Sequence, residues 1–471
     1  MRIHIEAQKA LKLGIDSIIE QFQLPLSFTP EIESKAENAA SEFRLQHGSR
    51  RDLTHVPFVT LDPATSTDLD QAFYLERDGD SIVLFYALAD IGAFVPHDGC
   101  ICQEAWKRGV TIYGIEGKIP LYPKSLSQRA ASLLPDGPRP AILVSVSIEE
   151  DGTFHLRRVE SIYCASRSKL AYDTTDIRAM PLLEAFAERM WRNEVSRGAM
   201  RVDSPQQEVI ADENAPGGVR LELRSRIYSE VVNSALSLAV NIALGELLRD
   251  AEIGLFRTMD TPNEGSIRQL RHAAHAYGIA WSETESLYDL QRRLDPSKMS
   301  HQRFLLESRR SGGRASYEVF SSKKKPWHSA IAATYVHATA PMRRLADRYV
   351  LDLALLVANG KVVPSWLVDV ISKLPEVMQR SENRANGVDR AVIDLIEAVS
   401  LLHRIGEVLD AEVVDADAGI VQTQEGAIRA RATNLPRCNH GDKVRVRIQE
   451  ADPAKRLVRF VAVSLRSTPI A

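Results

Sequence analysis

The sequence contains few cysteines, and their scarcity excludes two kinds of stabilised domain. Four cysteines in 471 residues, at positions 100, 102, 164 and 438, are too few and too scattered for a disulfide framework or a paired CxxC zinc site. The N-terminus lacks the apolar core of a signal peptide, and no uninterrupted run of 18 apolar residues occurs. We therefore expect a cytoplasmic protein with no membrane contact.

The chain also lacks a strong excess of one charge. Its net charge is −3 and its isoelectric point is near 6.5, which argues against a protein that coats nucleic acid non-specifically. A locally basic channel stays compatible with this balance. The content of 44% hydrophobic and 26% charged residues is typical of a globular protein, and 471 residues exceed the size of one average domain.

Acidic residues are abundant in one short segment. Asp62, Asp68 and Asp70 lie within Leu61–Gln71, between two strand-like runs at 58–61 and 72–75. Carboxylates this close repel one another unless a cation neutralises them, and hard divalent ions such as Mg²⁺ take oxygen ligands of this kind. The alternative is an ordinary polar turn, because Asp, Thr, Ser and Pro also favour solvated connections.

The order of the expected elements gives an α+β fold in three parts. Residues 1–50 are predicted to form a short extension of two helices. Residues 51–405 are predicted to form one large α+β domain, in which strands come first and helices follow, notably at 227–250, 345–359 and 388–408. Residues 406–471 contain five short strands separated by turns, which is typical of a five-stranded OB barrel.

The predicted barrel has an uneven charge distribution. Residues 406–428 contain six acidic residues and no Lys or Arg, whereas residues 429–466 contain ten Lys or Arg and three acidic residues. A basic face for phosphates is one interpretation, and a solvated barrel surface is the other. Phe460 is the only Phe, Tyr or Trp of this segment, so charge rather than base stacking would have to hold RNA.

A polar stripe interrupts the otherwise apolar helix predicted at 227–250. Its members recur at helical spacing: Glu230, Asn233, Ser234, Ser237 and Asn241. A polar stripe on a buried helix must meet partners or a wet cavity. It could line a substrate channel or bond neighbouring backbone groups.

Two adjacent arginines follow the segment Ala338–Met342, which is typical of a helix start. Backbone amides at a helix start favour an anion, and Arg343 and Arg344 suit bidentate phosphate binding there. We therefore predict both as candidates to contact a phosphate-containing substrate. A surface ion pair is the alternative for either one.

Several of these stretches together resemble one family. Thr60–Ala72 closely resembles the catalytic signature of the RNase II (RNB) family of exoribonucleases. Further stretches are similar to family blocks in the same order: Tyr86–Gly92, Arg108–Tyr113, Ile119–Pro123, Leu255–Thr258 and Thr339–Arg344. The resemblance spans residues 51–405, and the tail is similar to the family's S1-type OB domain.

The resemblance implies processive 3′→5′ hydrolysis of single-stranded RNA to nucleoside 5′-monophosphates with Mg²⁺, or Mn²⁺ in its place. By position, Asp62, Asp68 and Asp70 match metal-site aspartates, and Arg343 matches the arginine that stabilises the scissile phosphate. Under this hypothesis, Asp62 and Gln71 hold Mg²⁺, while Asp70 with Asp68 holds a second metal or orients the attacking water.

The resemblance also implies substrate contacts and partners. Tyr113 matches the aromatic residue that stacks on the last bases, and Tyr172 and Glu230 match residues near the terminal nucleotide. Single-stranded RNA is the implied partner, no organic cofactor is expected, and a monomer is favoured.

Two departures from the family pattern bear on activity. Gln71 stands where the family has a fourth aspartate, which removes one negative charge. By the same resemblance, we expect some fifty helical residues in the place of the family's usual pair of cold-shock OB domains. The main alternative is therefore a catalytically impaired RNA-binding protein, and a weaker one is an endonuclease.

Overall fold

The computed structural model describes most of the chain. The described residues are 2–43, 50–114, 117–199, 206–295, 298, 300–301, 304–305, 307–308, 313–423, 428–438 and 442–465. The mixture of helices and sheets confirms the predicted α+β class.

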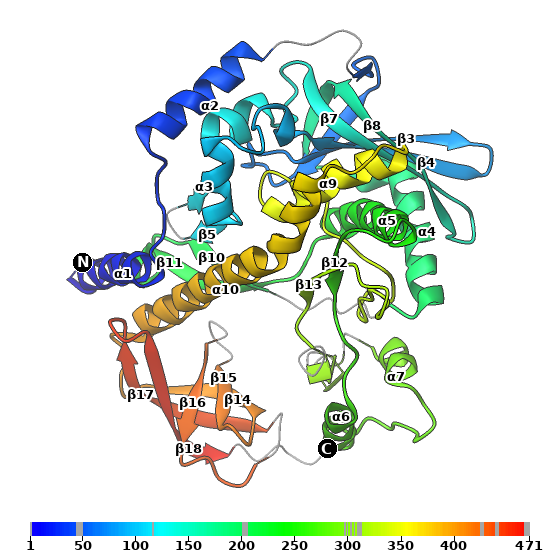
Figure 1. The fold of residues 1–471 in the computed structure, drawn as a ribbon. Helices are drawn as coiled ribbons and strands as arrows, with labels where there is room; N and C mark the ends of the chain where they lie inside the picture. The colour runs from blue at the N-terminus through cyan, green and yellow to red at the C-terminus, as the bar shows by residue number, and fades with distance from the viewer. Residues whose placement is uncertain are drawn as a thin grey trace.

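A seven-stranded sheet forms the centre of the large domain (Figure 1). Its strands, in spatial order, are β1 (Arg51–Asp52), β8 (Phe154–Cys164), β7 (Arg139–Ile148), β4 (Ser81–Ala89), β3 (Gln71–Asp78), β2 (Phe58–Asp62) and β9 (Ser166–Ala171). Neighbours are antiparallel except at the two edges, where β1 runs parallel to β8 and β9 runs parallel to β2. The turn at Asp78-Gly79 sets the β3–β4 register, and β2 ends at the aspartate segment.

Helices α4 (Pro181–Arg197), α5 (Tyr228–Asp250) and α9 (Leu345–Ala358) contact this sheet. Two further helices, α3 (Cys100–Arg108) and α10 (Ser365–Leu401), contact each other, and α10 also contacts α9. The α5 helix contacts β4, β7 and β8. Among the described residues, α5 alone is long and apolar enough to cross a membrane, but 67% of its apolar window is buried inside this fold. It is thus a core helix here.

The helix predicted at 388–408 is longer than expected, and it both begins and ends earlier than the sequence suggested. One helix, α10, runs from Ser365 to Leu401 with Pro375 inside it. Leu367, Ile371 and Leu374 recur on its buried face, so its first half is also held by packing. A proline normally ends a helix, so local propensity argues against a helix that continues through Pro375, and burial of this face overrides that tendency.

The predicted N-terminal helices are present and join the main hydrophobic core. They are α1 (Arg2–Phe22) and α2 (Pro30–Glu42), and Thr29 caps the second by accepting a hydrogen bond from the Ile32 amide. Ala7 and Leu11 of α1 are buried in the main core, and α1 lies against α10. This extension is therefore packed onto the large domain.

A small helical region with its own core was not anticipated. It contains α6 (Glu264–Ala276) and α7 (Leu287–Arg293). The buried side chains of Leu270 on α6, Leu290 on α7 and Phe304, which follows α7 in the chain, belong to a separate hydrophobic cluster. A two-stranded sheet of β12 (Leu255–Thr258) and β13 (Ser316–Val319) flanks it in sequence.

The tail forms the predicted five-stranded closed barrel, which confirms that part of the fold class. Its strands, in spatial order, are β14 (Val408–Asp415), β15 (Ile420–Thr423), β16 (Arg429–Thr433), β18 (Leu457–Leu465) and β17 (Lys443–Asp452). Phe460 is fully buried in the barrel core, so it offers no surface for base stacking.

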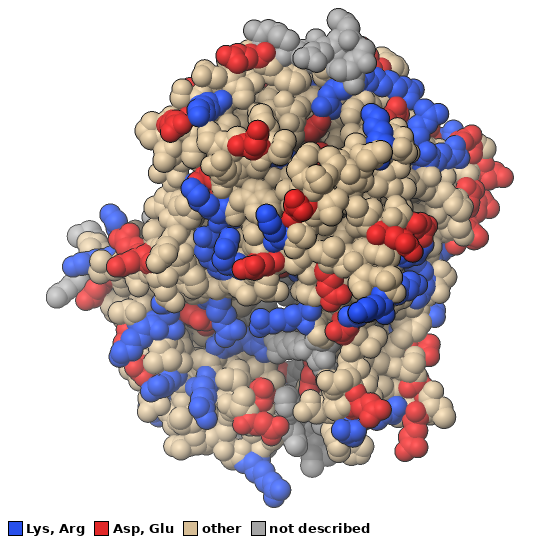
Figure 2. All heavy atoms as spheres, in the orientation of Figure 1, with Lys and Arg blue, Asp and Glu red and all other residues tan. Residues whose placement is uncertain are grey.

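Lys and Arg side chains gather in a band across the boundary between the barrel and the main body (Figure 2). The domain boundaries at 50 and 405 stay predictions.

Candidate active site

The aspartate segment is an ordered loop that connects adjacent strands β2 and β3. Fully buried Ser132 holds it, because the Leu69 amide donates to Ser132 Oγ over 2.9 Å and Ser132 Oγ donates to the Thr67 carbonyl over 2.8 Å. Lys169, on the edge strand β9, donates to the carbonyls of Ala64 and Ser66 over 2.6 and 2.5 Å. This loop is thus held from two sides, unlike an ordinary solvated turn.

Asp70 is buried and bonded to the segment that precedes α9. Its carboxylate accepts one hydrogen bond from Nε of Arg343 over 2.9 Å and one from the Met342 amide over 2.8 Å. Burial raises the pKa of Asp70 to about 7, while Arg343 and the Met342 amide act in the opposite direction. Asp70 is only 3% exposed, so little of it is open to substrate. In this arrangement its hydrogen bond orients the Arg343 side chain.

Asp62 closes β2 and lies beside the same arginine. Burial raises the pKa of Asp62 to about 6; nearby Arg343 lowers it and neighbouring Asp68 raises it. The Tyr172 amide donates to the Asp62 carbonyl over 3.2 Å, because Tyr172 directly follows β9, the strand that pairs with β2. The loop aspartates and Tyr172 therefore share one corner of the sheet.

Asp68 faces a short hairpin that the sequence analysis did not connect with it. The hairpin consists of β5 (Ile112–Gly114) and β6 (Gly117–Ile119), and Lys118 of β6 forms an ion pair with Asp68. Tyr113, directly opposite Lys118 across the hairpin, is 53% exposed and interacts with Arg343. Partial burial raises the pKa of Tyr113, and Arg343 opposes that shift.

Gln71 is fixed by both ends of its side-chain amide. Its Nε2 group donates to the Thr339 carbonyl, and its Oε1 atom accepts a hydrogen bond from the Tyr86 hydroxyl over 2.7 Å. A carboxylate at this position could not donate to the carbonyl. The amide therefore links β3, β4 and the segment before α9.

The side-chain oxygens of the aspartate loop and Gln71 are of the kind that a hard divalent ion binds, but their arrangement does not suit such an ion. Asp68 is paired with Lys118, Asp70 with Arg343, and the Gln71 oxygen with Tyr86. Within the described part of the chain, no three His, Cys, Asp or Glu side chains converge as a metal site. As arranged, the residues predicted to bind Mg²⁺ do not form a site for it, and their metal role stays a prediction.

A polar cavity of about 390 Å³ opens beside the loop and the Asp70–Arg343 pair. Every side chain that lines it carries a polar group: Gln71, Tyr172, Arg224, Arg226, Glu230, Asn233, Ser234, Ser237, Asn241, Tyr335, Thr339, Arg343 and Arg344. The whole polar stripe of α5 lies along this cavity. With four arginines and one glutamate, the lining favours an anionic ligand.

The stripe also makes the backbone contacts that were the alternative interpretation. Asn233 donates to the Leu61 carbonyl and to the Tyr172 hydroxyl, over 3.2 and 2.9 Å. Asn241 accepts from the Ala338 amide over 3.0 Å and donates to Thr339 Oγ1 over 3.2 Å. The two interpretations are therefore compatible, because these amides support the cavity wall and line it.

Two further predicted substrate residues are held by ion pairs at the cavity. Glu230 accepts two hydrogen bonds from Arg224, each of 2.9 Å, and the pairing lowers the pKa of Glu230. Arg344 donates to both carboxylate oxygens of buried Asp347, over 2.9 and 2.7 Å. Both residues thus have fixed orientations.

The anion site expected on backbone amides before α9 is taken by the protein itself. The helix begins at Leu345, and the amides of Ala340 and Met342 donate to the carboxylates of Asp347 and Asp70. These amides anchor the segment that carries Arg343 and are not free to bind an anion. The Arg343 side chain, which is 44% exposed, is the group of this segment that can contact one.

The structure thus gathers all the predicted site residues in one region, and it adds residues that the sequence analysis missed. Lys118, Lys169, Tyr335 and Arg224 lie outside the motifs quoted above, and Tyr86 opens the family-like stretch Tyr86–Gly92 without having been assigned to the site. The hairpin register offered one signal: Phe73 pairs with Tyr86, which places Tyr86 diagonally across from Gln71 on the same face of the sheet.

Comparisons with known proteins find relatives of similar sequence and structures of similar fold. The chain is 26% identical over 437 residues to Ribonuclease R of Thermotoga maritima, covering 86% of this chain and 60% of that relative. The chain therefore spans less than two thirds of that relative's length. Its fold is similar to Mycoplasma genitalium RNase R in complex with ribose-methylated single-stranded RNA, with a TM-score of 0.85, 18% identity and coverage of 96% of this chain and 78% of that one.

The fold is also similar to that of yeast Ssd1, a pseudonuclease, with a TM-score of 0.68, 15% identity and coverage of 94% of this chain and 57% of that one. Residues 407–463 match the RNase II-type exonuclease C-terminal S1 domain, which coincides with the β14–β18 barrel. Residues 50–357, which contain the sheet, the aspartate loop and Arg343, match the RNB domain. The chain therefore belongs to the RNB domain family.

Proposed function

We propose that this protein is an exoribonuclease that degrades single-stranded RNA processively from the 3′ end to nucleoside 5′-monophosphates. One observation carries the proposal: the arginine-rich cavity, the aspartate loop and Arg343 meet at one place in an RNB domain. The cavity volume of about 390 Å³ lies within the roughly 300–1,000 Å³ typical of small-ligand sites. It is suited to one anionic nucleotide at a chain end.

The proposed roles follow from the contacts. Arg343 stabilises negative charge that develops on the scissile phosphate, and its bond to buried Asp70 fixes it before substrate binds. Tyr172 and Glu230 position the terminal nucleotide from the cavity wall. Tyr113 stacks on a base, since its ring is half exposed on the hairpin beside Arg343.

Magnesium, or manganese in its place, stays part of the proposal. Exoribonucleases of the RNB family generally depend on divalent metal ions. Because the carboxylates of Asp68 and Asp70 and the side-chain oxygen of Gln71 are engaged by the chain's own groups here, we assign no step of the reaction to the metal.

The test uses 5′-end-labelled poly(A) with Mg²⁺, with and without EDTA, read on a denaturing gel. We expect the label to collapse to short oligomers with Mg²⁺ and to stay intact with EDTA. Asp70→Asn should abolish turnover and keep RNA binding, whereas the matched control Asp369→Asn, an exposed position on α10, should retain the wild-type rate. Full turnover by Asp70→Asn would contradict the assigned roles.

The second candidate is an RNA-binding protein that cuts poorly or not at all. Two contacts favour this candidate: the ion pair of Asp68 with Lys118, and the hydrogen bonds at both ends of the Gln71 amide. Both engage oxygen atoms that would otherwise be available as metal ligands. Intact label with a mobility shift on a native gel would support this candidate. A blocked 3′ end distinguishes the endonuclease, since only exonucleolysis should stop.

A further inference from the structure

Lys118 reaches the aspartate loop from a hairpin with two chemically different faces. Tyr113 and Lys118 are directly paired across the strands, so both side chains lie on one face, and this face meets Arg343 and Asp68. The neighbouring pair, Ile112 and Ile119, lies on the other face. The hairpin therefore presents a cation and an aromatic ring to the site.

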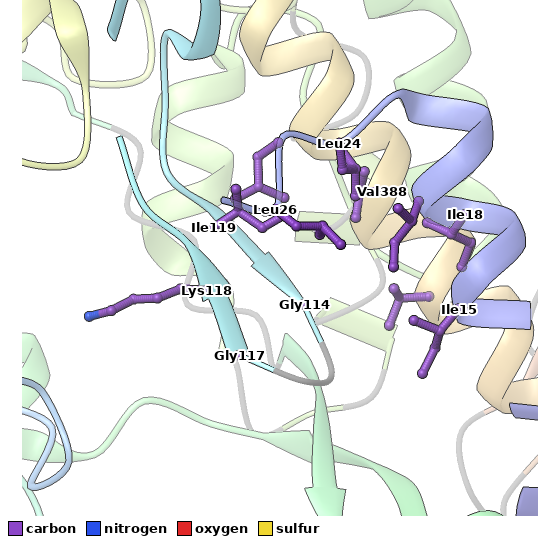
Figure 3. Close-up of a pocket in the computed structure, with 12 residues that line it drawn as sticks. Ile15, Ile18, Leu24, Leu26, Gly114, Gly117, Lys118, Ile119 and Val388 are labelled. Carbon is purple, nitrogen blue, oxygen red and sulfur yellow. The ribbon is translucent and has the colours of Figure 1, made fainter. Parts of the chain in front are cut away.

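The apolar face of the hairpin borders a cavity of about 260 Å³ (Figure 3). Ile15 and Ile18 of α1, the following Leu24 and Leu26, and Val388 of α10 line it from the opposite side. Lys118 also borders this cavity, but Figure 3 shows its side chain directed away from these apolar residues. Its ammonium is thus committed to the site side of the hairpin.

The ammonium of Lys118 occupies the position beside the Asp68 carboxylate that a bound metal cation would need. Its side chain is 22% exposed and that of Asp68 is 13% exposed, so water screens the pair only partly. Asp62 and Asp70 both interact electrostatically with Asp68, which makes this the acidic centre of the loop. A divalent ion at Asp68 and the Lys118 ammonium would repel each other at contact distance.

We propose that Lys118 is an internal competitor for the divalent cation, so that a metal ion binds Asp68 only by displacing the Lys118 ammonium. The inference rests on the proposed function, because it concerns the metal dependence proposed there. Lys118 is a positioning residue in this account, since it acts on the affinity for the ion.

The experiment measures binding of Mn²⁺ and Mg²⁺ to the full chain without RNA, by isothermal titration calorimetry. We expect Lys118→Met to bind the ion at least about tenfold more tightly than the wild type, because methionine keeps the apolar stem and removes the charge. Lys118→Gln is the second variant, should the first fail to fold. Lys361→Met, an exposed position after α9 with the same change in net charge, should leave the affinity unchanged.

A double-mutant cycle assigns the effect to Asp68. In an Asp68→Asn background, removal of Lys118 should no longer raise the affinity. Equal affinities of the wild type and Lys118→Met, an undiminished gain in the Asp68→Asn background, or no binding by any variant would each overturn the inference. RNA turnover by the wild type is read separately, so a working exoribonuclease with a silent Lys118 remains distinguishable from an inactive protein.

Discussion

The carboxylate of Asp70 lies 2.9 Å from Nε of Arg343, although 273 positions separate the two residues in sequence. The family resemblance implies a separate role in the reaction for each residue, but their contact makes them one unit. The Asp70 carboxylate accepts hydrogen bonds from the Arg343 guanidinium and from the backbone amide of Met342. These two bonds fix the direction in which the Arg343 side chain extends into the polar cavity.

Replacement of Arg343 by lysine is expected to lower turnover by about 10²-fold or more and to weaken RNA binding less. Lysine keeps the charge but loses the planar fork that can bond a carboxylate and a phosphate together. Single-turnover degradation of labelled RNA measures the effect. Arg268→Lys, an exposed position on α6, is the matched control. A rate within twofold of the wild type for Arg343→Lys would show that the fork is dispensable.

Gln71→Glu is expected to lower the free energy of unfolding by about 1–3 kcal/mol. The substituted carboxylate has the same shape but cannot donate to the Thr339 carbonyl, so two acceptors would face each other in a partly buried place. Thermal or urea unfolding at neutral pH measures the change. Gln379→Glu, on the exposed face of α10, also removes a donor, here toward Asn383 Oδ1, but water can replace that bond, so stability should change little. Equal effects of the two substitutions would contradict the structural role of Gln71.

The sequence predicted several elements of the fold well because local patterns determine them. The β3–β4 turn at Asp78-Gly79, the α5 helix and the five barrel strands all follow from hydrophobic periodicity and turn residues. The contact of Asp70 with Arg343 depends on how distant elements pack, and no local pattern contains that information. The sequence could suggest that both residues matter, but not that one orients the other.

The errors have physical causes of the same kind. Pro375 hid the first half of α10, since local propensity argues against a helix that tertiary packing stabilises. Lys118 had no motif, because its partner Asp68 lies fifty positions away on a loop whose path only the fold determines. The departure at Gln71 was recognised as a lost charge, whereas the gained link between Tyr86 and Thr339 needed the structure.

Asn241→Ala is expected to lower stability by about 1–3 kcal/mol and also to reduce RNA turnover. Asn241 satisfies the buried Ala338 amide and bonds Thr339, so its loss leaves a buried donor without a partner and loosens the segment that leads to Arg343. Chemical unfolding and the labelled-RNA assay provide the two readouts. Asn383→Ala, at an exposed position on α10, is the control. Lost stability with unchanged turnover would show that this anchor does not act on Arg343.

Glu397 couples the barrel to α10 in a way that depends on pH. Its carboxylate accepts a hydrogen bond from the Arg429 amide of β16 over 3.1 Å, and it is 4% exposed. Burial raises the pKa of Glu397 from 4.5 to about 7, with the Arg429 bond acting in the opposite direction. The folded protein therefore retains a proton that the unfolded chain releases between about pH 4.5 and 7.

The sign of the effect follows from this difference in bound protons. Because the folded state binds more protons in that window, its stability falls as pH rises and the full cost is present above pH 7. Glu397→Gln mimics the protonated side chain and should be more stable than the wild type by about 3 kcal/mol at pH 8, with little difference at pH 4.5. Urea unfolding at both pH values measures this, with exposed Glu376→Gln as the control. A gain of the same size at both pH values would mean that the substitution acts through packing and not through the charge of Glu397.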